Sequence, residues 1–205
     1  MHDWGKFITP GSPARFTSGM ILALLTPASS VAPSPATTAA GALLESLAWL
    51  TFLGLGIALA VIDARSRRLP NRLVALLTAG GLLFFTSAAI VEQNLPALWR
   101  ALAGLGISFA LYLVISLAAR GGLGAGDVKL AAPVGLYLGW LGWEALVWGI
   151  VLAFVVGGMV GLIVAARERR IRGLTVPFGP FMLAGVVVTA GLVACGPLIS
   201  TSSIS

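Results

Sequence analysis

Two of the seven carboxylates in this 205-residue chain, Asp63 and Asp127, lie where side-chain chemistry is most expected. Each stands at the point where an apolar segment meets a basic loop. An ionisable group beside such a segment is costly to keep there, so its presence indicates a function. The other five carboxylates have ordinary positions in the amino-terminal segment, near apolar edges or among arginines: Asp3, Glu45, Glu92, Glu144 and Glu168.

A pair of neighbouring carboxyls can hydrolyse an amide without a metal ion. Because two close negative charges repel, one carboxyl keeps a proton while the other is ionised. The ionised carboxyl can accept a proton from a water molecule that attacks a carbonyl carbon, and the protonated carboxyl can donate to the carbonyl oxygen. Since His2 and Cys195 are the single histidine and cysteine of the chain, we predict neither a metal site nor a cofactor.

Glycines precede Asp127 in the order Gly121-Gly-Leu-Gly-Ala-Gly-Asp127. We expect this stretch to be non-helical and to let the backbone approach a ligand closely. A helix that begins at Val128 would have Asp127 at its amino end, where the helix dipole favours a negative charge, so we expect Asp127 to be the readier of the pair to ionise. The alternative interpretation is a plain glycine-rich loop followed by an aspartate helix cap.

The elements that must position these residues are membrane helices. The chain is 58% hydrophobic and 10% charged, with a mean hydropathy of +1.00, whereas about a quarter of the residues of a soluble domain are charged. Its apolar runs approach the roughly 20 residues that a helix needs to cross a bilayer. We therefore predict an all-α, polytopic integral membrane protein with about six transmembrane helices, near residues 41–62, 73–91, 97–119, 128–141, 145–166 and 177–198.

The basic residues indicate how these helices are oriented. Ten of the 13 lysines and arginines fall in the first, third and fifth loops, near residues 65–72, 120–129 and 167–172. Because cytoplasmic loops are enriched in lysine and arginine, we expect these loops, with Asp63 and Asp127, at the cytoplasmic face, and both termini outside. The net charge of +6 is thus a sign of topology, and we predict no nucleic-acid partner.

Composition also predicts the domain boundaries. Residues 1–40 are rich in Pro, Ser, Thr and Ala and are expected to form a flexible, extracytoplasmic tail. Residues 41–199 would form the six-helix membrane domain, and residues 200–205 a short second tail. Within the membrane domain, six glycines are expected to allow close helix packing: Gly54, Gly56, Gly104, Gly106, Gly135 and Gly139.

Three segments, in order, resemble the motifs of one family. Gly124-Ala-Gly-Asp127 followed by Val128-Lys129-Leu130 looks like a Gly-x-Gly-Asp signature, and Asp63-Ala-Arg65 with Leu69-Pro70-Asn71 is similar to a first aspartate motif. Val176-Pro-Phe-Gly-Pro-Phe181 resembles a later Pro-Phe-Gly-Pro-Phe segment. Together they are similar to the motifs of the type IV prepilin peptidases, over residues 45–190.

The resemblance implies a membrane aspartic endopeptidase that cleaves the leader from pilin-like precursors at the cytoplasmic face of the cell membrane. Asp63 and Asp127 would be the catalytic aspartates. Active-site support or substrate binding would come from Gly124, Gly126, Lys129, Pro70 and Asn71. Its partners would be the precursor protein and the lipid bilayer.

Larger members of this family carry an additional amino-terminal domain whose paired cysteines bind zinc and which is associated with N-methylation of the new pilin end. Nothing in this sequence matches that domain. The resemblance therefore implies a compact form with peptidase activity alone, as in enzymes that serve Flp-type pili or archaeal flagellin-like precursors.

Other interpretations remain open at this stage. A non-enzymatic transporter or pilus-assembly scaffold could use Asp63 and Asp127 to bind protons or cations. Lys129 could extend to the membrane interface as an anchor. Asn71 could cap the second helix, and Pro177 and Pro180 could begin or bend the sixth.

Overall fold

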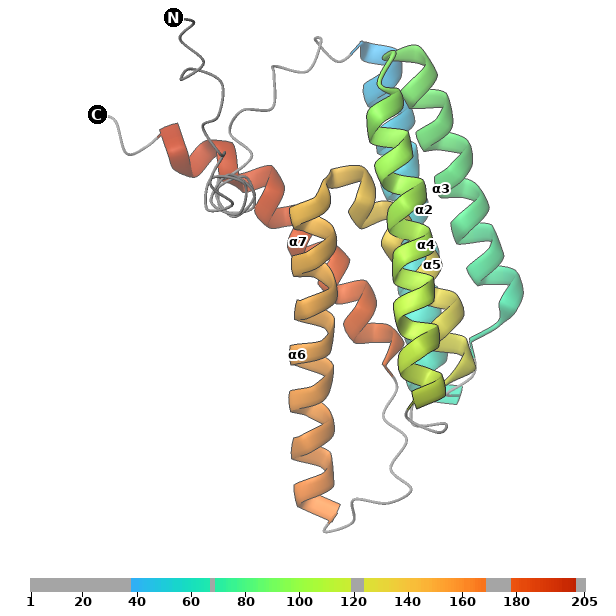
Figure 1. Ribbon diagram of the computed structural model, residues 1–205, viewed down its shortest axis with the longest axis vertical. Coiled ribbons are helices and arrows are strands. Elements are labelled where there is room, and N and C mark those ends of the chain that lie inside the picture. The colour runs from blue at the N-terminus through green and yellow to red at the C-terminus, as the bar shows by residue number, and fades with distance from the viewer. Residues whose placement is uncertain (1–37, 67–68, 119–123, 169–177, 202–205) are drawn as a thin grey trace, which may run out of the picture. The chain divides into compact units, whose positions relative to one another are not determined.

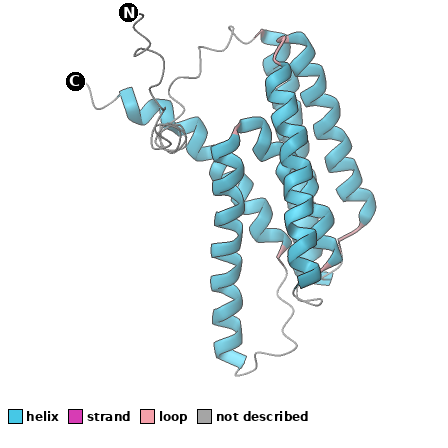
Figure 2. Ribbon diagram, in the orientation of Figure 1, coloured by secondary structure: helices cyan, strands magenta, loops and turns pink. Residues whose placement is uncertain are grey.

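The computed structural model describes residues 38–66, 69–118, 124–168 and 178–201. Its elements are six α-helices, and no strand occurs in these ranges (Figure 1, Figure 2). They are α2 (Ala39–Ser66), α3 (Asn71–Val91), α4 (Leu95–Ala118), α5 (Ala125–Leu141), α6 (Trp143–Glu168) and α7 (Gly179–Thr201). The predicted all-α class and the six helices are confirmed. The predicted tails, 1–40 and 200–205, lie largely outside the described residues.

Four helices are long and apolar enough to cross a membrane: α2, α3, α4 and residues Trp143–Ile163 of α6. The apolar part of α7, Gly179–Cys195, is shorter, and α5 has 17 residues. Many large apolar side chains on the four spans are exposed, among them Ile57, Leu83, Val114 and Met159. Outward apolar surface of this kind is what a helix needs against lipid.

Helix α5 is the centre of the bundle, and it contacts α3, α4, α6 and α7. Twelve of its 17 residues are buried, in contrast to the spans around it. The Tyr137 hydroxyl donates a 3.0 Å hydrogen bond to the carbonyl oxygen of Ala48 on α2. The Tyr137 ring also packs against Phe52 and Phe85, at centroid distances of 4.7 and 5.0 Å. The short helix is therefore fixed by side chains from its neighbours.

Glycines let α4 and α5 approach each other closely. A methyl group on Gly104 would overlap the carbonyl oxygen of Gly135, and one on Gly139 would lie 2.6 Å from the carbonyl oxygen of Arg100. On α2, a methyl group on Gly56 would meet Leu183 of α7 at 3.5 Å. The predicted packing role is confirmed at these four glycines.

The same prediction is wrong for Gly54 and Gly106. Both are exposed, and no atom lies within 4 Å of a methyl group added to either. They lie on faces of α2 and α4 that no described helix covers.

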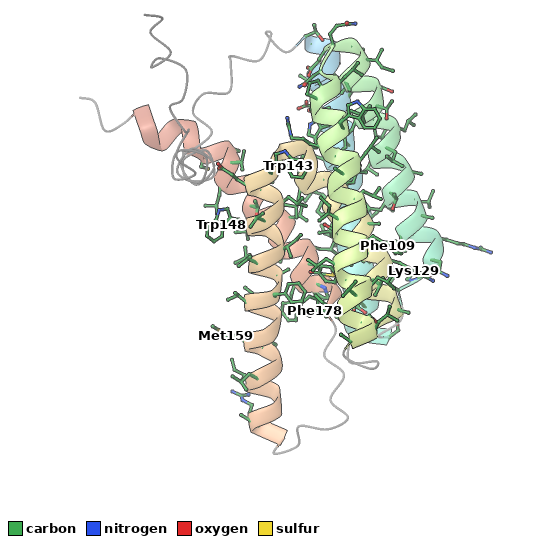
Figure 3. All side chains as sticks on the ribbon, in the orientation of Figure 1. Phe109, Lys129, Trp143, Trp148, Met159 and Phe178 are labelled. Carbon is green, nitrogen blue, oxygen red and sulfur yellow. The ribbon has the colours of Figure 1, made fainter. Side chains whose placement is uncertain are left out.

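Successive helices alternate in direction, so one end of the bundle collects the carboxyl ends of α2 and α4 and the amino ends of α3, α5 and α7. This end is at the bottom of the α2–α5 group in Figure 1. Lys129 and Phe178 are labelled toward it in Figure 3, whereas Trp143 is labelled toward the other end. Asp63 and Asp127 both lie in helix turns at this end.

Candidate active site

Asp63 lies three residues before the end of α2 and is buried, with 5% of its surface exposed. It continues the buried face formed by Phe52, Gly56 and Leu59, whose spacing of three and four residues keeps side chains on one side of a helix. Its Oδ2 atom accepts a hydrogen bond of 3.2 Å from the backbone N–H of Gly179. That N–H belongs to the first residue of α7, where the free donors and the dipole of a helix favour a negative charge.

Asp127 is the third residue of α5, because the helix begins at Ala125 and not at Val128 as predicted. Gly124 is the residue before the helix, with extended backbone angles of φ −65° and ψ 142°. The backbone of Gly124 donates a hydrogen bond to the Asp127 carboxylate, while the Asp127 N–H donates to the Gly124 carbonyl oxygen at 3.0 Å. Asp127 is therefore not the cap residue that the alternative interpretation proposed. Its carboxylate, in the first turn of the helix, accepts a hydrogen bond from the backbone of Gly124 before the helix, as the acidic residue of a capping box does.

The glycine-rich stretch is only partly as expected. Ala125 and Gly126 are helical, whereas we predicted a non-helical backbone up to Asp127. Gly126 faces Leu69, and a methyl group there would lie 3.0 Å from the Leu69 Cδ1 atom. Residues 121–123 lie outside the described residues.

Both aspartates line one cavity of about 370 Å³ at this end of the bundle. Of the seven predicted site residues, the structure brings six to this cavity: Asp63, Asp127, Gly124, Gly126, Lys129 and Asn71. Pro70 is not in the lining. It immediately precedes α3, with extended backbone angles, and it follows Leu69, whose side chain does line the cavity.

Lys129 and Asn71 contact each other at the cavity. The Lys129 Nζ atom donates a 3.0 Å hydrogen bond to the Asn71 Oδ1 atom. The prediction that Asn71 caps the second helix is wrong, because Asn71 is already helical and the helix has no side-chain cap. Lys129 is exposed, and its amine is held by Asn71 of α3, while its role as an anchor at the membrane interface stays a prediction.

Burial raises the pKa of the Asp127 carboxyl to about 6, and the nearby Asp63 carboxyl adds to the rise. Asp127 lies in the first turn of α5, outside the four helices that can cross a membrane. The hydrogen bond from Gly124 acts in the opposite direction but does not outweigh burial. This rise in the Asp127 pKa is opposite in direction to the prediction that Asp127 is the readier of the pair to ionise. A contribution from Asp63 to this pKa is expected, because the two carboxyls line the same cavity.

Sequence reasoning missed two residues beside the aspartates. Gly179 supplies the hydrogen bond to Asp63, and it stands inside the Val176–Phe181 segment that the motif comparison had noticed. Tyr112 of α4 is fully buried and interacts electrostatically with Asp127. Its ring stacks on Phe154 at 5.0 Å, and its hydroxyl has no hydrogen-bond partner in the described part of the chain. No sequence signal marks Tyr112.

Pro180 is the second residue of α7, which confirms that it begins the sixth helix. Pro177, for which the same role was predicted, lies outside the described residues.

Comparison with known proteins identifies the family. Residues 49–165, more than half of the chain and including both aspartates, match the type IV leader peptidase family. The chain belongs to this family. The resemblance noted in the sequence is thereby confirmed, and with the apolar helices it makes the chain a multi-pass membrane protein.

Several bacterial relatives of this leader peptidase family member carry the name prepilin leader peptidase/N-methyltransferase. The one from Escherichia coli K12 is 33% identical over 139 residues, 67% of this chain and 60% of the relative. The one from Aeromonas hydrophila is 32% identical over 164 residues, covering 80% and 53% of the two chains. The one from Burkholderia pseudomallei K96243 is 37% identical over 137 residues, covering 65% and 42%.

The chain thus spans about half the length of the curated relatives that it matches. No solved structure matches it significantly.

Proposed function

We propose that this protein is a membrane aspartic endopeptidase that cleaves the leader peptide from pilin-like precursors, with Asp63 and Asp127 as its catalytic pair. One observation carries the proposal: the two buried carboxyls, 64 positions apart in sequence, line the same polar cavity. Membership in the leader peptidase family and the names of the relatives support the choice of reaction and substrate.

The reaction we propose begins with a water molecule between the two carboxyls. The ionised carboxyl accepts a proton from this water as the water oxygen bonds to the carbonyl carbon of the peptide. The protonated carboxyl gives its proton to the carbonyl oxygen, and a tetrahedral diol forms. The C–N bond then breaks as the carboxyl that took the proton from water gives it to the leaving amine. The other carboxyl takes a proton from one hydroxyl of the diol, which leaves a carboxylic acid product and restores the starting protonation of the pair.

We assign the base to Asp63 and the proton to Asp127. The Gly179 N–H and the amino end of α7 stabilise a negative charge on Asp63. Asp127, with a pKa of about 6, holds a proton more readily than an ordinary aspartate. Asymmetric surroundings of this kind give two equivalent side chains different roles.

The remaining cavity residues would support the pair. Lys129 carries a positive charge that Asn71 holds at the cavity, where it can hydrogen-bond a substrate carbonyl. Gly124 places no side chain against the Asp127 carboxyl, since a methyl group there would lie 3.2 Å from the Asp127 Oδ2 atom. We place this end of the bundle at the cytoplasmic face of the cell membrane, because the basic residues Arg65, Arg72 and Lys129 lie in helix turns at this end.

The proposal is tested by reconstituting the chain with a pilin-like precursor and measuring leader cleavage. We expect Asp63→Asn and Asp127→Asn each to lower the rate by roughly 100- to 10,000-fold, the range of general acid–base catalysis. Glu144→Gln is the matched control, since Glu144 is an exposed carboxylate in the first turn of α6, at the opposite end of the bundle. Cleavage at the wild-type rate by both aspartate variants would falsify the assignment.

The alternative of a transporter or scaffold that binds ions at Asp63 and Asp127 is not favoured by the family. Reconstitution of the chain in lipid vesicles can decide between the two functions. Ion flux that depends on the two aspartates, in the absence of any cleavage, would replace the peptidase proposal with the transport function.

A further inference from the structure

An apolar groove runs along the seam between α2 and α7, outside the catalytic cavity, with a volume of about 170 Å³. Its floor consists of buried residues from both helices, Phe52, Gly56 and Leu183. Its edges are exposed aliphatic side chains, Leu53, Ile57 and Val187. No other described helix covers these edges, and α2 is one of the helices able to cross the membrane, so the groove faces the lipid.

The groove leads directly to the candidate catalytic carboxylate. On α2, Phe52, Gly56 and Asp63 belong to one buried face, and the rise of a helix places Asp63 about 16 Å along the axis from Phe52. On α7, the groove residue Pro180 follows Gly179, whose N–H binds Asp63. The apolar groove therefore ends at Ala60 and Pro180, within one helix turn of Asp63, which lines the polar cavity.

We propose that the peptide substrate carries an apolar membrane helix directly after its leader, and that this groove docks that helix, with the bond to be cleaved at its end beside Asp63. The inference rests on the proposed peptidase function and specifies how its substrate is held. The helix lies in the groove within the hydrocarbon layer. The polar leader that precedes it enters the cavity lined by Asp127, Lys129 and Asn71.

The walls of the groove suit a helix more closely than a lipid chain. Three groove residues are small: Gly56 and Ala60 on α2, which are spaced four apart, and Ala184 on α7. Small residues at this spacing let helix backbones approach each other in membranes, where apolarity alone gives no preference over lipid. Between them, the edge residues Leu53, Ile57 and Val187 offer apolar side chains that can interdigitate with those of an incoming helix.

The change from apolar groove to polar cavity also explains where cleavage would occur. A peptide bond inside a helix has its N–H and C=O groups hydrogen-bonded along the helix and is poorly exposed to attack. Beyond the groove, the walls become polar at Asp63 and the Gly179 N–H, so the substrate backbone can leave the helix there and meet water. The site of cleavage is then fixed by how far the helix slides along the groove.

A cysteine cross-linking experiment tests the docking directly. Cys195 is first replaced by Ser, since no other cysteine occurs in the chain, and Ala184→Cys is introduced at the groove. The probe is a pilin-like precursor with one cysteine in the first turns of its apolar helix. Ala110→Cys is the control, an exposed position on α4 away from the groove. We expect a disulfide with the precursor at residue 184 and at most one-tenth of that yield at residue 110.

A second experiment fills the groove. Ala184→Trp is expected to raise the KM for the membrane-anchored precursor at least tenfold and to change kcat much less. The control variant Ala110→Trp is expected to change neither KM nor kcat. Loss of kcat without a change in KM would show a structural effect and overturn the docking proposal. So would normal kinetics of Ala184→Trp together with equal cross-linking at residues 184 and 110, which would leave lipid as the occupant.

These outcomes separate the two levels of the proposal. If the wild-type chain cleaves no precursor, the peptidase function is wrong and the docking inference falls with it. If the wild type cleaves the precursor but the groove variants behave like their α4 controls, only the docking inference is wrong.

Discussion

The backbone N–H of Gly179 lies 3.2 Å from the Oδ2 atom of Asp63 and donates a hydrogen bond to it. This bond joins the carboxyl end of α2 to the amino end of α7, across 116 positions of sequence. It fixes the direction of one candidate catalytic carboxyl and supplies it with a helix amino terminus. A methyl group on Gly179 would lie 2.7 Å from the same oxygen, so the contact has no room for a side chain.

Gly179→Ala is therefore expected to lower the rate of leader cleavage by about 10- to 100-fold. The added methyl group must displace the Asp63 carboxyl, and hydrogen bonds to charged groups contribute roughly 1.5–3 kcal/mol, equivalent to this range of rates. Cleavage kinetics and thermal unfolding are measured together. Gly106→Ala is the control, because no atom lies within 4 Å of its added methyl group. A Gly179→Ala enzyme with unchanged activity would show that this bond does not orient Asp63.

Gly135→Ala is expected to destabilise the fold by roughly 1–3 kcal/mol, the usual cost of overpacking a close interface. Its methyl group would overlap the Gly104 carbonyl oxygen and the Ser108 side chain, so α4 and α5 would have to separate. Denaturant unfolding in detergent measures the change, again with Gly106→Ala on α4 as the comparison. Equal stability of the two variants would mean that the α4–α5 approach is looser than the structure shows.

The sequence predicted the six helices well because membrane helices must be long, apolar and internally hydrogen-bonded. It predicted boundaries less well where a helix continues past its apolar part. Helix α2 runs to Ser66, four residues beyond the predicted end at Ile62, and so Asp63 is a helical residue. Helix α5 starts at Ala125 despite its glycines, and Gly126 in its first turn faces Leu69.

The site was predictable only where a local motif marks it. Both aspartates, and the glycines that precede Asp127, stand in short recognisable segments, and six of the seven predicted site residues line the cavity. The bond from Gly179 to Asp63 depends on how α7 packs against α2, and no spacing in sequence encodes it. Similarly, Gly56 and Gly54 look alike in sequence, but only the packing of α7 distinguishes the contacting face of α2 from the face toward lipid.

Tyr112→Phe and Tyr137→Phe form a matched pair of predictions about stability. The Tyr137 hydroxyl donates to the Ala48 carbonyl oxygen, so its removal is expected to cost about 1 kcal/mol. The Tyr112 hydroxyl is buried without a partner among the described residues, so its removal is expected to be neutral or stabilising. Thermal midpoints in the same detergent compare the two. A larger loss for Tyr112→Phe would reveal a hydrogen bond to that hydroxyl.

The pKa of about 6 at Asp127 predicts how cleavage depends on pH. If the reaction needs one proton on the pair, the reactive form is lost as pH rises through this value, and kcat/KM should fall by up to tenfold for each further pH unit. At much lower pH the second carboxyl also takes up a proton, and the rate should fall again, with both apparent pKa values belonging to the pair.

Initial cleavage rates across this range, with a thermal unfolding curve at each pH, separate titration of the pair from loss of the fold. Glu144→Gln should reproduce the wild-type profile, since its carboxylate is exposed at the other end of the bundle. A rate that stays constant or keeps rising well above pH 6, while the protein remains folded, would mean that a protonated Asp127 takes no part in the reaction.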